Sequence, residues 1–472
     1  MTILTRQTDG RRPRLLTCHT RPPRIAAVSA PPAPAASGLT SERLAARALA
    51  AIPGGVNSGA RRFPGVDDVV IVSANGATFT DATGRSLVDY HAAYGPVILG
   101  HCDPDVGAAF MDAVSSVDLT GLGVTPYEIA LAEKIQEHVP CAERVVLLCT
   151  GTEATFYAVR LARGVTGRRL LIKFQGCFHG GHDAVALNVI SAADRVGTKD
   201  PLSTGILPEV IDATLVLPFN DLDAVRHAVA EHRGEVAAII LEPIPHNIGC
   251  VLPEQAFLEG LREVCDREEI VLIFDEVITG FRHGLGGYQA ICGVTPDLAS
   301  LGKAMANGFP IAALAGRADL MEQLSTVPGR PVMLAGTYNG HPGTAAAALA
   351  TIEKMEREPV HDHIFRLGER VRTGLRSMFD RIGVEAYVTG LGSVWVTYFL
   401  SGPVRSYDDL LRNDADLYVG YRRRLVERGI FELPANLKRN HISYAHTDAH
   451  VDELIDATEW AVLRELEQRG AR

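Results

Sequence analysis

A carboxylate pair and a lysine are the residues whose types and spacing first suggest chemistry. Asp275 and Glu276 end the apolar run at 271–274, and Lys303 follows another short apolar segment. Pyridoxal phosphate (PLP) needs such a set, because a carboxylate keeps its pyridine nitrogen protonated and a lysine amine holds its aldehyde as a Schiff base. The alternative is a buried acid and an unrelated lysine in an ordinary α/β enzyme, so these two segments alone do not decide.

Polar residues also follow an earlier predicted strand, at 144–148. The sequence TGTEA at 150–154 comes after it and opens a predicted helix. Hydroxyls and backbone N–H groups at a helix N-terminus can form a cup for a phosphate. The alternative is an ordinary N-cap with a capping acid.

The next two strands, predicted at 170–174 and 237–241, end in residues of the same kind. Phe178, flanked by glycines, could lie flat against a cofactor ring or be a packed loop aromatic. Neither His179 nor its neighbour His182 has acidic or cysteine partners at ligand spacing, so no metal site is predicted. Glu242 places a carboxylate directly after the later strand.

These residues require a scaffold that brings strand ends together. Short continuous apolar strands alternate with helical patterns from about residue 101 to 315, which is typical of a mostly parallel sheet covered on both faces. Ligands of such α/β folds bind at the carboxyl edge of the sheet, where the strand ends meet.

The flanking segments predict a second, smaller unit. We expect a helix over 41–51 with Ser41 as its cap, and a hairpin over 69–80 that turns at Asn75 and Gly76. A long alanine-rich helix should begin near 345, followed by strands near 393–400 and 429–433. The predicted organisation is an extension (1–40), a segment joining the small domain (41–95), a large PLP-binding domain (96–345) and a small C-terminal domain (346–472).

Composition excludes several classes of function. The net charge of −10 argues against nucleic acid and against an anionic membrane surface. The eight cysteines are scattered without a CxxC pair, which favours reduced thiols in a cytoplasmic protein. No apolar run approaches the roughly 20 residues that a membrane helix needs.

The first 38 residues differ from the rest, with six arginines, six prolines and a single acid, Asp9. Two interpretations of this segment are open: it is an organelle transit peptide, or it is a disordered extension or the product of an upstream start codon. Prolines at 22, 23, 31, 32 and 34 disfavour the amphipathic helix of a transit peptide, so disorder or an upstream start codon is the preferred interpretation.

Several ordered motifs carry a family resemblance: PGGVNS at 53–58, YGP at 94–96, GTEA at 151–154, GCFHG at 176–180, DEVITGFR at 275–282, GVTPD at 293–297, LGK at 301–303 and GT at 336–337. From about Ser41 to Glu465 the chain resembles the class III (fold type I) PLP-dependent aminotransferases, specifically the glutamate-1-semialdehyde 2,1-aminomutase branch. The resemblance implies an α/β fold whose large domain holds a mostly parallel, seven-stranded sheet sandwiched by helices, with a smaller α/β C-terminal domain.

The resemblance also implies roles around the cofactor. Lys303 would be the Schiff-base lysine and proton shuttle, and Asp275 would pair with the pyridinium nitrogen. Val277 would pack against the ring. Further cofactor contacts are implied for Gly151 and Thr152 at the phosphate, and for Phe178 (usually tyrosine in the family), His179 and Glu242.

Thr337 matches a threonine that reaches the phosphate of the neighbouring subunit's cofactor. The resemblance therefore implies a homodimer with shared active sites, acting on a small-molecule amino donor and an oxo acceptor.

The substrate end shows departures from the aminomutases. Ser58 and Arg61 match residues near the substrate, and Arg61 is either a carboxylate clamp or a surface arginine. Tyr94 stands where the aminomutases usually have tryptophan, and Lys438 where they have a glutamate that disfavours ordinary amino acids. A cation there attracts a carboxylate by on the order of 4 kcal/mol at 4 Å and an effective dielectric near 20, before desolvation.

We therefore expect a PLP-dependent aminotransferase that moves an amino group from an amino acid, by default L-glutamate, to a small carboxylate-bearing ketone or aldehyde. A specialised biosynthetic pathway is inferred from the divergence alone. The alternatives are an aminomutase or PLP racemase, which retains its intermediate, and a non-catalytic protein with the same fold.

Overall fold

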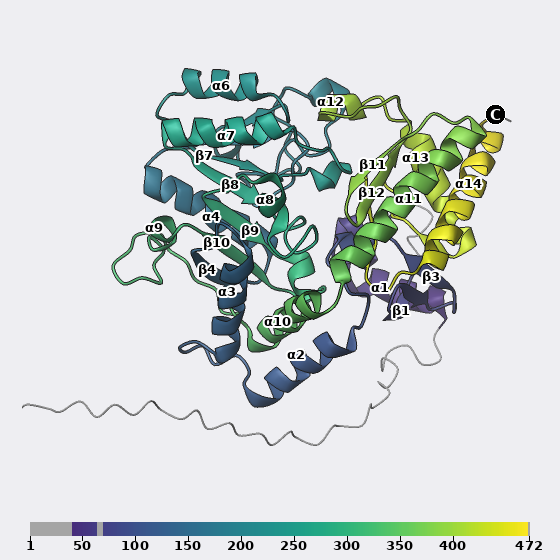
Figure 1. Ribbon diagram of the computed structural model, residues 1–472, viewed down its shortest axis with the longest axis horizontal. Helices are drawn as coiled ribbons and strands as arrows, with labels where there is room; N and C mark the ends of the chain where they lie inside the picture. The colour runs from purple at the N-terminus through teal and green to yellow at the C-terminus, as the bar shows by residue number, and fades with distance from the viewer. Residues whose placement is uncertain (1–39, 64–68, 471–472) are drawn as a thin grey trace, which may run out of the picture. The chain divides into compact units, whose positions relative to one another are not determined.

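The computed structural model describes residues 40–63 and 69–470, and its centre is a seven-stranded sheet (Figure 1). The strand order is β4-β10-β9-β8-β7-β5-β6. Strand β10 runs antiparallel to both of its neighbours, β4 and β9. The remaining neighbouring pairs, β9–β8, β8–β7, β7–β5 and β5–β6, are parallel. The predicted mostly parallel sheet is confirmed. Its strands are β4 (Arg144–Leu148), β5 (Leu170–Phe174), β6 (Thr214–Leu217), β7 (Val236–Leu241), β8 (Val271–Asp275), β9 (Leu298–Leu301) and β10 (Ala312–Gly316).

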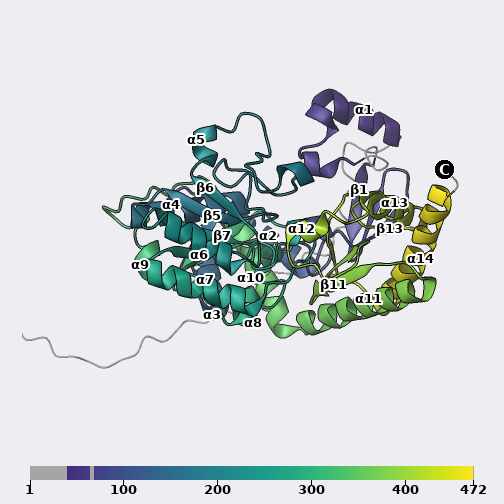
Figure 2. The ribbon, with the colours of Figure 1, turned by 90° about the horizontal axis from the view of Figure 1, so that it is seen from above.

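Helices cover both faces of this sheet because alternate strand residues point to opposite sides. Val271 and Ile273 of β8 pack in one apolar cluster with α4 (Gly151–Thr166). Leu272 and Phe274 belong to the other cluster, with α3 (Pro126–His138), α6 (Leu222–Glu231) and α7 (Gln255–Glu268). Figure 2 shows α6 and α7 stacked along the sheet. The predicted α/β sandwich is therefore present.

The N-terminal segment forms a second sheet with a strand from the C-terminal part of the chain. Strands β1 (Ile71–Asn75) and β2 (Thr78–Asp81) pair antiparallel, as the hairpin prediction requires, and β3 (Ser86–Asp89) follows. Strand β13 (Ile430–Phe431) adds to β3 in parallel. This pairing supports our proposal that residues 41–95 join the small domain.

One helix cap differs from the prediction. Helix α1 (Ser41–Ala51) begins where expected, but Thr40 is its N-cap, because the Thr40 hydroxyl accepts a hydrogen bond from Arg43 N. Ser41 is the first helical residue.

The C-terminal part builds a three-stranded sheet from β11 (Tyr387–Leu391), β12 (Val394–Tyr398) and β14 (Asn440–His441), all antiparallel. Helix α11 (Val360–Ile382) packs on β11 and β12, and α14 (Asp448–Gly470) contacts both α11 and α13 (Ala415–Leu425). The alanine-rich helix is α10 (Pro342–Arg357). The remaining helices are α2 (Pro104–Ser116), α5 (Pro208–Ile211), α8 (Gly287–Cys292), α9 (Ala318–Met321) and α12 (Tyr407–Leu410).

The predicted disordered extension at 1–40 lies outside the described residues, except for Thr40. Among the described helices, none combines the length and the apolar character needed to cross a membrane.

Candidate active site

A cavity of about 350 Å³ lies at the carboxyl edge of the seven-stranded sheet. The last residue of β8 and residues that follow β4, β5, β7 and β9 line it. These residues include Cys149, Thr150, Gly151, Thr152, Phe178, His179, Gly180, Glu242, Asn247, Asp275, Val277, Ile278 and Lys303. The residues predicted to bind the cofactor thus meet in one place, except Thr337.

Asp275 is held rigidly at this cavity. It is only 5% exposed, and its Oδ2 lies 2.8 Å from His179 Nδ1. Its Oδ1 accepts a hydrogen bond of 3.1 Å from Val277 N. A buried carboxylate fixed at both oxygens can face a positively charged ring without reorganising.

Lys303 follows the end of β9 with a φ of 46°, in the left-handed region that non-glycine residues rarely adopt. Its Nζ makes no hydrogen bond or ion pair with any described residue. Burial lowers the pKa of Lys303 to about 8, and the nearby cation of Arg439 contributes to the lowering. The neutral amine, the form that attacks an aldehyde, is therefore more populated at neutral pH than it is for an ordinary lysine.

The N-terminus of α4 leaves two backbone amides for an anion. Thr150 and Glu153 form a capping box, in which Glu153 Oε2 accepts hydrogen bonds from Cys149 N and Thr150 N. The cap leaves the amides of Gly151 and Thr152 without partners among the described residues. The capping role and the phosphate cup are therefore compatible, because they use different groups.

The loop after β5 packs tightly onto this helix end. Thr155 Oγ1 donates a 2.5 Å hydrogen bond to His179 O. Gly180 has a φ of 98°, and a Cβ atom built there would lie 2.6 Å from Thr152 Oγ1. Only glycine permits this approach, which brings the predicted ring-contacting and phosphate-binding segments together.

Phe178 and Glu242 complete the cavity wall. Phe178 is 37% exposed and lines the cavity, so it is not a packed loop aromatic. Its backbone N donates a 2.8 Å hydrogen bond to Glu242 Oε1, which also accepts from Asn247 Nδ2. Burial raises the pKa of Glu242, and the charge of Asp275 adds to this effect.

These groups fit PLP. A fixed carboxylate suits the ring nitrogen, a lysine with an unpartnered amine suits the aldehyde, and free amides at a helix N-terminus suit the phosphate. Gly151 also fits, since a Cβ there would lie 2.9 Å from Val277 Cγ1 and displace the side chain predicted to contact the ring.

The predicted substrate residues do not gather in the same cavity. Arg61 and Tyr94 line a neighbouring, largely apolar cavity of about 420 Å³. Ser58 is exposed and lines neither cavity. Lys438 is close to the Lys303 cavity, because its Nζ donates a 2.8 Å hydrogen bond to the carbonyl of Asn247. Thr337 is exposed and lines neither cavity.

Sequence reasoning missed Arg439. This side chain is 2% exposed and donates a 2.7 Å hydrogen bond from Nη2 to the carbonyl of Tyr94. Its only signal was its place beside Lys438, and neither composition nor spacing shows that it is buried.

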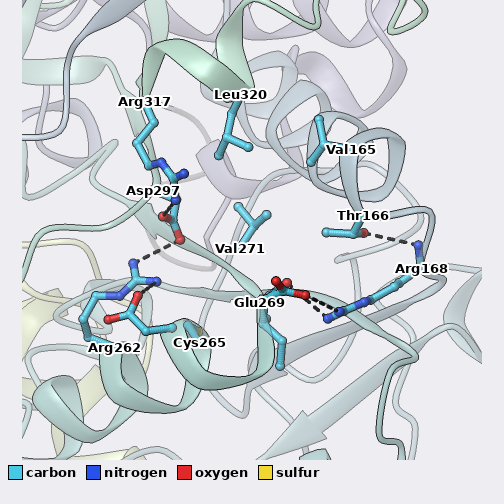
Figure 3. A pocket seen from close by; sticks show the side chains of 12 residues that line it. Val165, Thr166, Arg168, Arg262, Cys265, Glu269, Val271, Asp297, Arg317 and Leu320 are labelled. Carbon is cyan, nitrogen blue, oxygen red and sulfur yellow. Dashed lines mark hydrogen bonds and ion pairs between the residues drawn. The ribbon is translucent and has the colours of Figure 1, made fainter.

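A third cavity, of about 480 Å³, lies at the opposite edge of the sheet (Figure 3). Asp297 organises it, accepting from Arg262 Nη1 at 3.0 Å, from Arg317 Nη1 at 2.8 Å and from Leu272 N at 2.7 Å. The positive and negative side chains that line this cavity compensate one another. Their contacts connect the starts of strands to the ends of helices rather than presenting reactive groups.

The fold and the cavity together define a fold type I PLP-dependent enzyme. The Aminotransferase class-III family matches residues 62–461, and the chain belongs to it. A glutamate-1-semialdehyde 2,1-aminomutase from Methanopyrus kandleri is 41% identical over 418 residues, covering 89% of this chain and 96% of the relative. An enzyme of the same name from Methanocaldococcus jannaschii is 40% identical, covering 89% and 97%.

Solved structures agree. An omega-transaminase from Sphaerobacter thermophilus superposes with a TM-score of 0.85 at 33% identity, covering 91% of this chain and 98% of that one. A glutamate-1-semialdehyde aminomutase variant from Pseudomonas aeruginosa, in complex with PMP, gives 0.81 at 25% identity, covering 90% and 94%. The predicted enzyme class, fold and cofactor are confirmed.

Proposed function

We propose that this enzyme moves an amino group from an amino acid donor, L-glutamate first, to a small carboxylate-bearing ketone or aldehyde. The observation that carries the proposal is Lys438. The aminomutase resemblance implies a glutamate at this position. Here a cation lies beside the cavity, with no carboxylate within 4.0 Å among the described residues. Such a charge attracts the carboxylate of an external amino acid.

The chain's own residues have distinct tasks in this proposal. PLP, when bound, supplies an aldehyde and an electron-accepting ring. Asp275 would keep the ring nitrogen protonated, and the amides of Gly151 and Thr152 would hold the phosphate. Lys303 Nζ would hold the aldehyde, and its amine would accept the proton from the donor's Cα.

We also propose a cytoplasmic homodimer with shared sites. Thr337 is exposed, and Met333 and Tyr338 beside it are 63% and 64% exposed. Exposed large apolar side chains around a residue expected to act in a neighbouring subunit support a contact between two copies of the chain.

A second candidate is glutamate-1-semialdehyde 2,1-aminomutase activity. The relatives at about 40% identity carry this name, and they favour this candidate over the first. The two activities share every residue around the cofactor, and they differ in whether a separate donor is consumed.

A single half-reaction tests the proposal. The PLP-loaded enzyme is mixed with L-glutamate without an acceptor, while the absorbance of the lysine-bound cofactor and the release of 2-oxoglutarate are followed. One 2-oxoglutarate per site supports the external donor. An unchanged spectrum with L-glutamate, followed by isomerisation of glutamate-1-semialdehyde without donor consumption, supports the second candidate. A Lys303→Ala variant with full activity would refute both.

A further inference from the structure

A further cavity, of about 540 Å³, lies beside α4 and shares no lining residue with the Lys303 cavity. Its polar side chains are those of Arg160, Arg163, His182 and Asp183. The apolar part of its wall is formed by Phe156, Val159, Ala184 and Val210. Small-molecule sites have volumes of roughly 300–1,000 Å³, so this cavity is large enough for a small ligand.

The two arginines of this cavity have no acidic partner. Neither Arg160 nor Arg163 has a carboxylate within 4.0 Å among the described residues. By contrast, Arg226 on α6 pairs with Asp223 at 3.2 Å. Burial lowers the pKa of Arg163, and the charge of the nearby Arg169 adds to this lowering. The guanidinium groups therefore gather here without the carboxylates that usually compensate them.

One aromatic ring of α4 orders the side chains around the cavity. Phe156, Arg160 and Arg163 are separated by four and three positions, so they lie on one face of the helix. The Cζ atom of Arg160 lies 4.1 Å from the centroid of the Phe156 ring. The His182 ring meets the same ring in a T-shaped arrangement, with centroids 5.6 Å apart. Phe156 therefore positions a guanidinium and an imidazole beside the same cavity.

Several hydrogen-bonding groups of these side chains are unused. Arg163 Nε donates a 3.0 Å hydrogen bond to the carbonyl of Arg169. Arg163 Nη2 and His182 Nε2 are buried and have no hydrogen-bond partner in the described part of the chain. Arg160 makes its ring contact but no hydrogen bond to a described residue. Buried polar groups are normally hydrogen-bonded, so this set indicates a ligand that supplies acceptor atoms.

The charges of the cavity favour an anion. Burial lowers the pKa of His182 to about 4, and the charges of His179 and Arg163 contribute, so this imidazole is neutral at pH 7. Asp183 is exposed and forms no ion pair with a described residue, so water screens its charge. The two guanidinium charges of the wall therefore exceed the single carboxylate. Guanidinium groups match the oxygens of a phosphate, and a neutral imidazole can donate one further hydrogen bond.

We propose that this cavity binds the phosphate group of a small ligand, with Arg160 and Arg163 pairing with phosphate oxygens and His182 donating a hydrogen bond. The apolar wall favours a phosphate ester with an aromatic or aliphatic part over inorganic phosphate. The site is separate from the cofactor cavity, although α4 and the loop after β5 contribute to both. It does not depend on which amino transfer the enzyme performs.

Binding of an unreactive probe tests this assignment. Pyridoxine 5′-phosphate is an aromatic phosphate ester without an aldehyde, and pyridoxine is its counterpart without the phosphate. Treating the PLP-loaded enzyme with borohydride first fixes the cofactor in its own cavity, so the probe cannot exchange into it. Equilibrium dialysis in phosphate-free buffer should then show one probe per chain, bound about tenfold tighter than pyridoxine or more. An enzyme that binds the two equally, or binds neither, overturns the proposal.

Competition with inorganic phosphate distinguishes the two sources of the phosphate group. Displacement of the probe at similar concentrations means that the phosphate group alone is recognised. Displacement only at much higher concentrations means that the site is built for an ester, and both results support the proposal. Failure of inorganic phosphate to displace the probe at any concentration overturns it.

Variants then assign the binding to this cavity. Arg160→Gln and Arg163→Gln should each weaken binding of pyridoxine 5′-phosphate about 10- to 100-fold, the effect of losing a charge-assisted contact, and leave pyridoxine unchanged. The matched control is Arg226→Gln, since Arg226 is exposed and lies on α6, which covers the other face of the sheet. Wild-type affinity in both cavity variants overturns the proposal.

A further variant covers misfolding. Arg163 also bonds the carbonyl of Arg169, so Arg163→Lys is the second test if Arg163→Gln cannot be purified with cofactor. Lysine keeps the charge but loses the planar fork, and we expect binding to weaken about fivefold; unchanged affinity overturns the proposal. Arg160 is exposed, so Arg160→Gln should fold and decides the matter by itself if both Arg163 variants fail. These readouts do not depend on turnover, so they can succeed even where the L-glutamate half-reaction fails.

Discussion

Asp275 is the residue on which the ring chemistry depends in this proposal, because both of its oxygens are already oriented by His179 and Val277. Asp275→Asn keeps the shape but removes the charge that holds a proton on the ring nitrogen. We expect kcat to fall about 10²- to 10³-fold with cofactor still bound, as for loss of one electrostatic contact to a transition state. Steady-state assays and cofactor absorbance measure this. Asp183→Asn, at an exposed position four residues after His179, should stay within twofold; comparable losses in both would argue against the assigned role.

Lys303 gives a pH prediction at the same scale. Its pKa is lowered from 10.5 to about 8, so the nucleophilic amine is present above this pH and lost below it. The rate at which cofactor-free enzyme links covalently to PLP should therefore rise with pH and level off, with a midpoint near 8. Stopped-flow absorbance measures the rate. Because the Arg439 cation contributes to the lowering, the midpoint should move upward in Arg439→Gln. A wild-type midpoint near 10 would contradict the lowered pKa of this lysine.

At the scale of elements, the contact between the loop after β5 and the start of α4 builds the phosphate end. Gly180→Ala would place a methyl group 2.6 Å from Thr152 Oγ1 at a φ of 98°, which costs roughly 1–2 kcal/mol in backbone strain alone. We expect the affinity for PLP to fall about tenfold or more. Fluorescence titration of cofactor-free enzyme measures it. Gly181→Ala is the matched control, because nothing lies within 4 Å of its Cβ position. Equal affinities in the two variants would mean that the loop does not shape the site.

The strands and helices also show how much of the secondary structure can be predicted from local sequence. Apolar β-branched runs such as β7 and β8 were predicted, since a strand buried on both faces must be apolar along its length. Strand β10, with the sequence AALAG, has no such preference and becomes a strand through pairing with β4 and β9. The N-cap of α1 lies one residue before the predicted position, because either of two adjacent hydroxyl residues, Thr40 and Ser41, could supply it.

At the scale of the whole molecule, the predicted site is accurate where strand ends position it. Asp275, Glu242 and Lys303 follow strands of one sheet, so their order along the chain predicts that they meet. Arg439 is positioned by the carbonyl of Tyr94, from a distant segment, and by His441, which is itself held at the carbonyl of His91. Its burial without an acidic partner results from tertiary packing alone, and no local sequence pattern predicts it.

The shared-site dimer is the prediction that belongs to the assembled molecule. If Thr337 acts in the neighbouring subunit, Lys303→Ala and Thr337→Ala protomers should complement each other. A mixed dimer would then hold one site with both substitutions and one with neither. Refolding equal amounts together should make half of the dimers mixed, so about a quarter of all sites regain wild-type behaviour. Activity at limiting PLP measures the recovery, and sedimentation should give the mass of two 50.7 kDa chains. Activity equal to the average of the two parents would place Thr337 in its own subunit's site or in none.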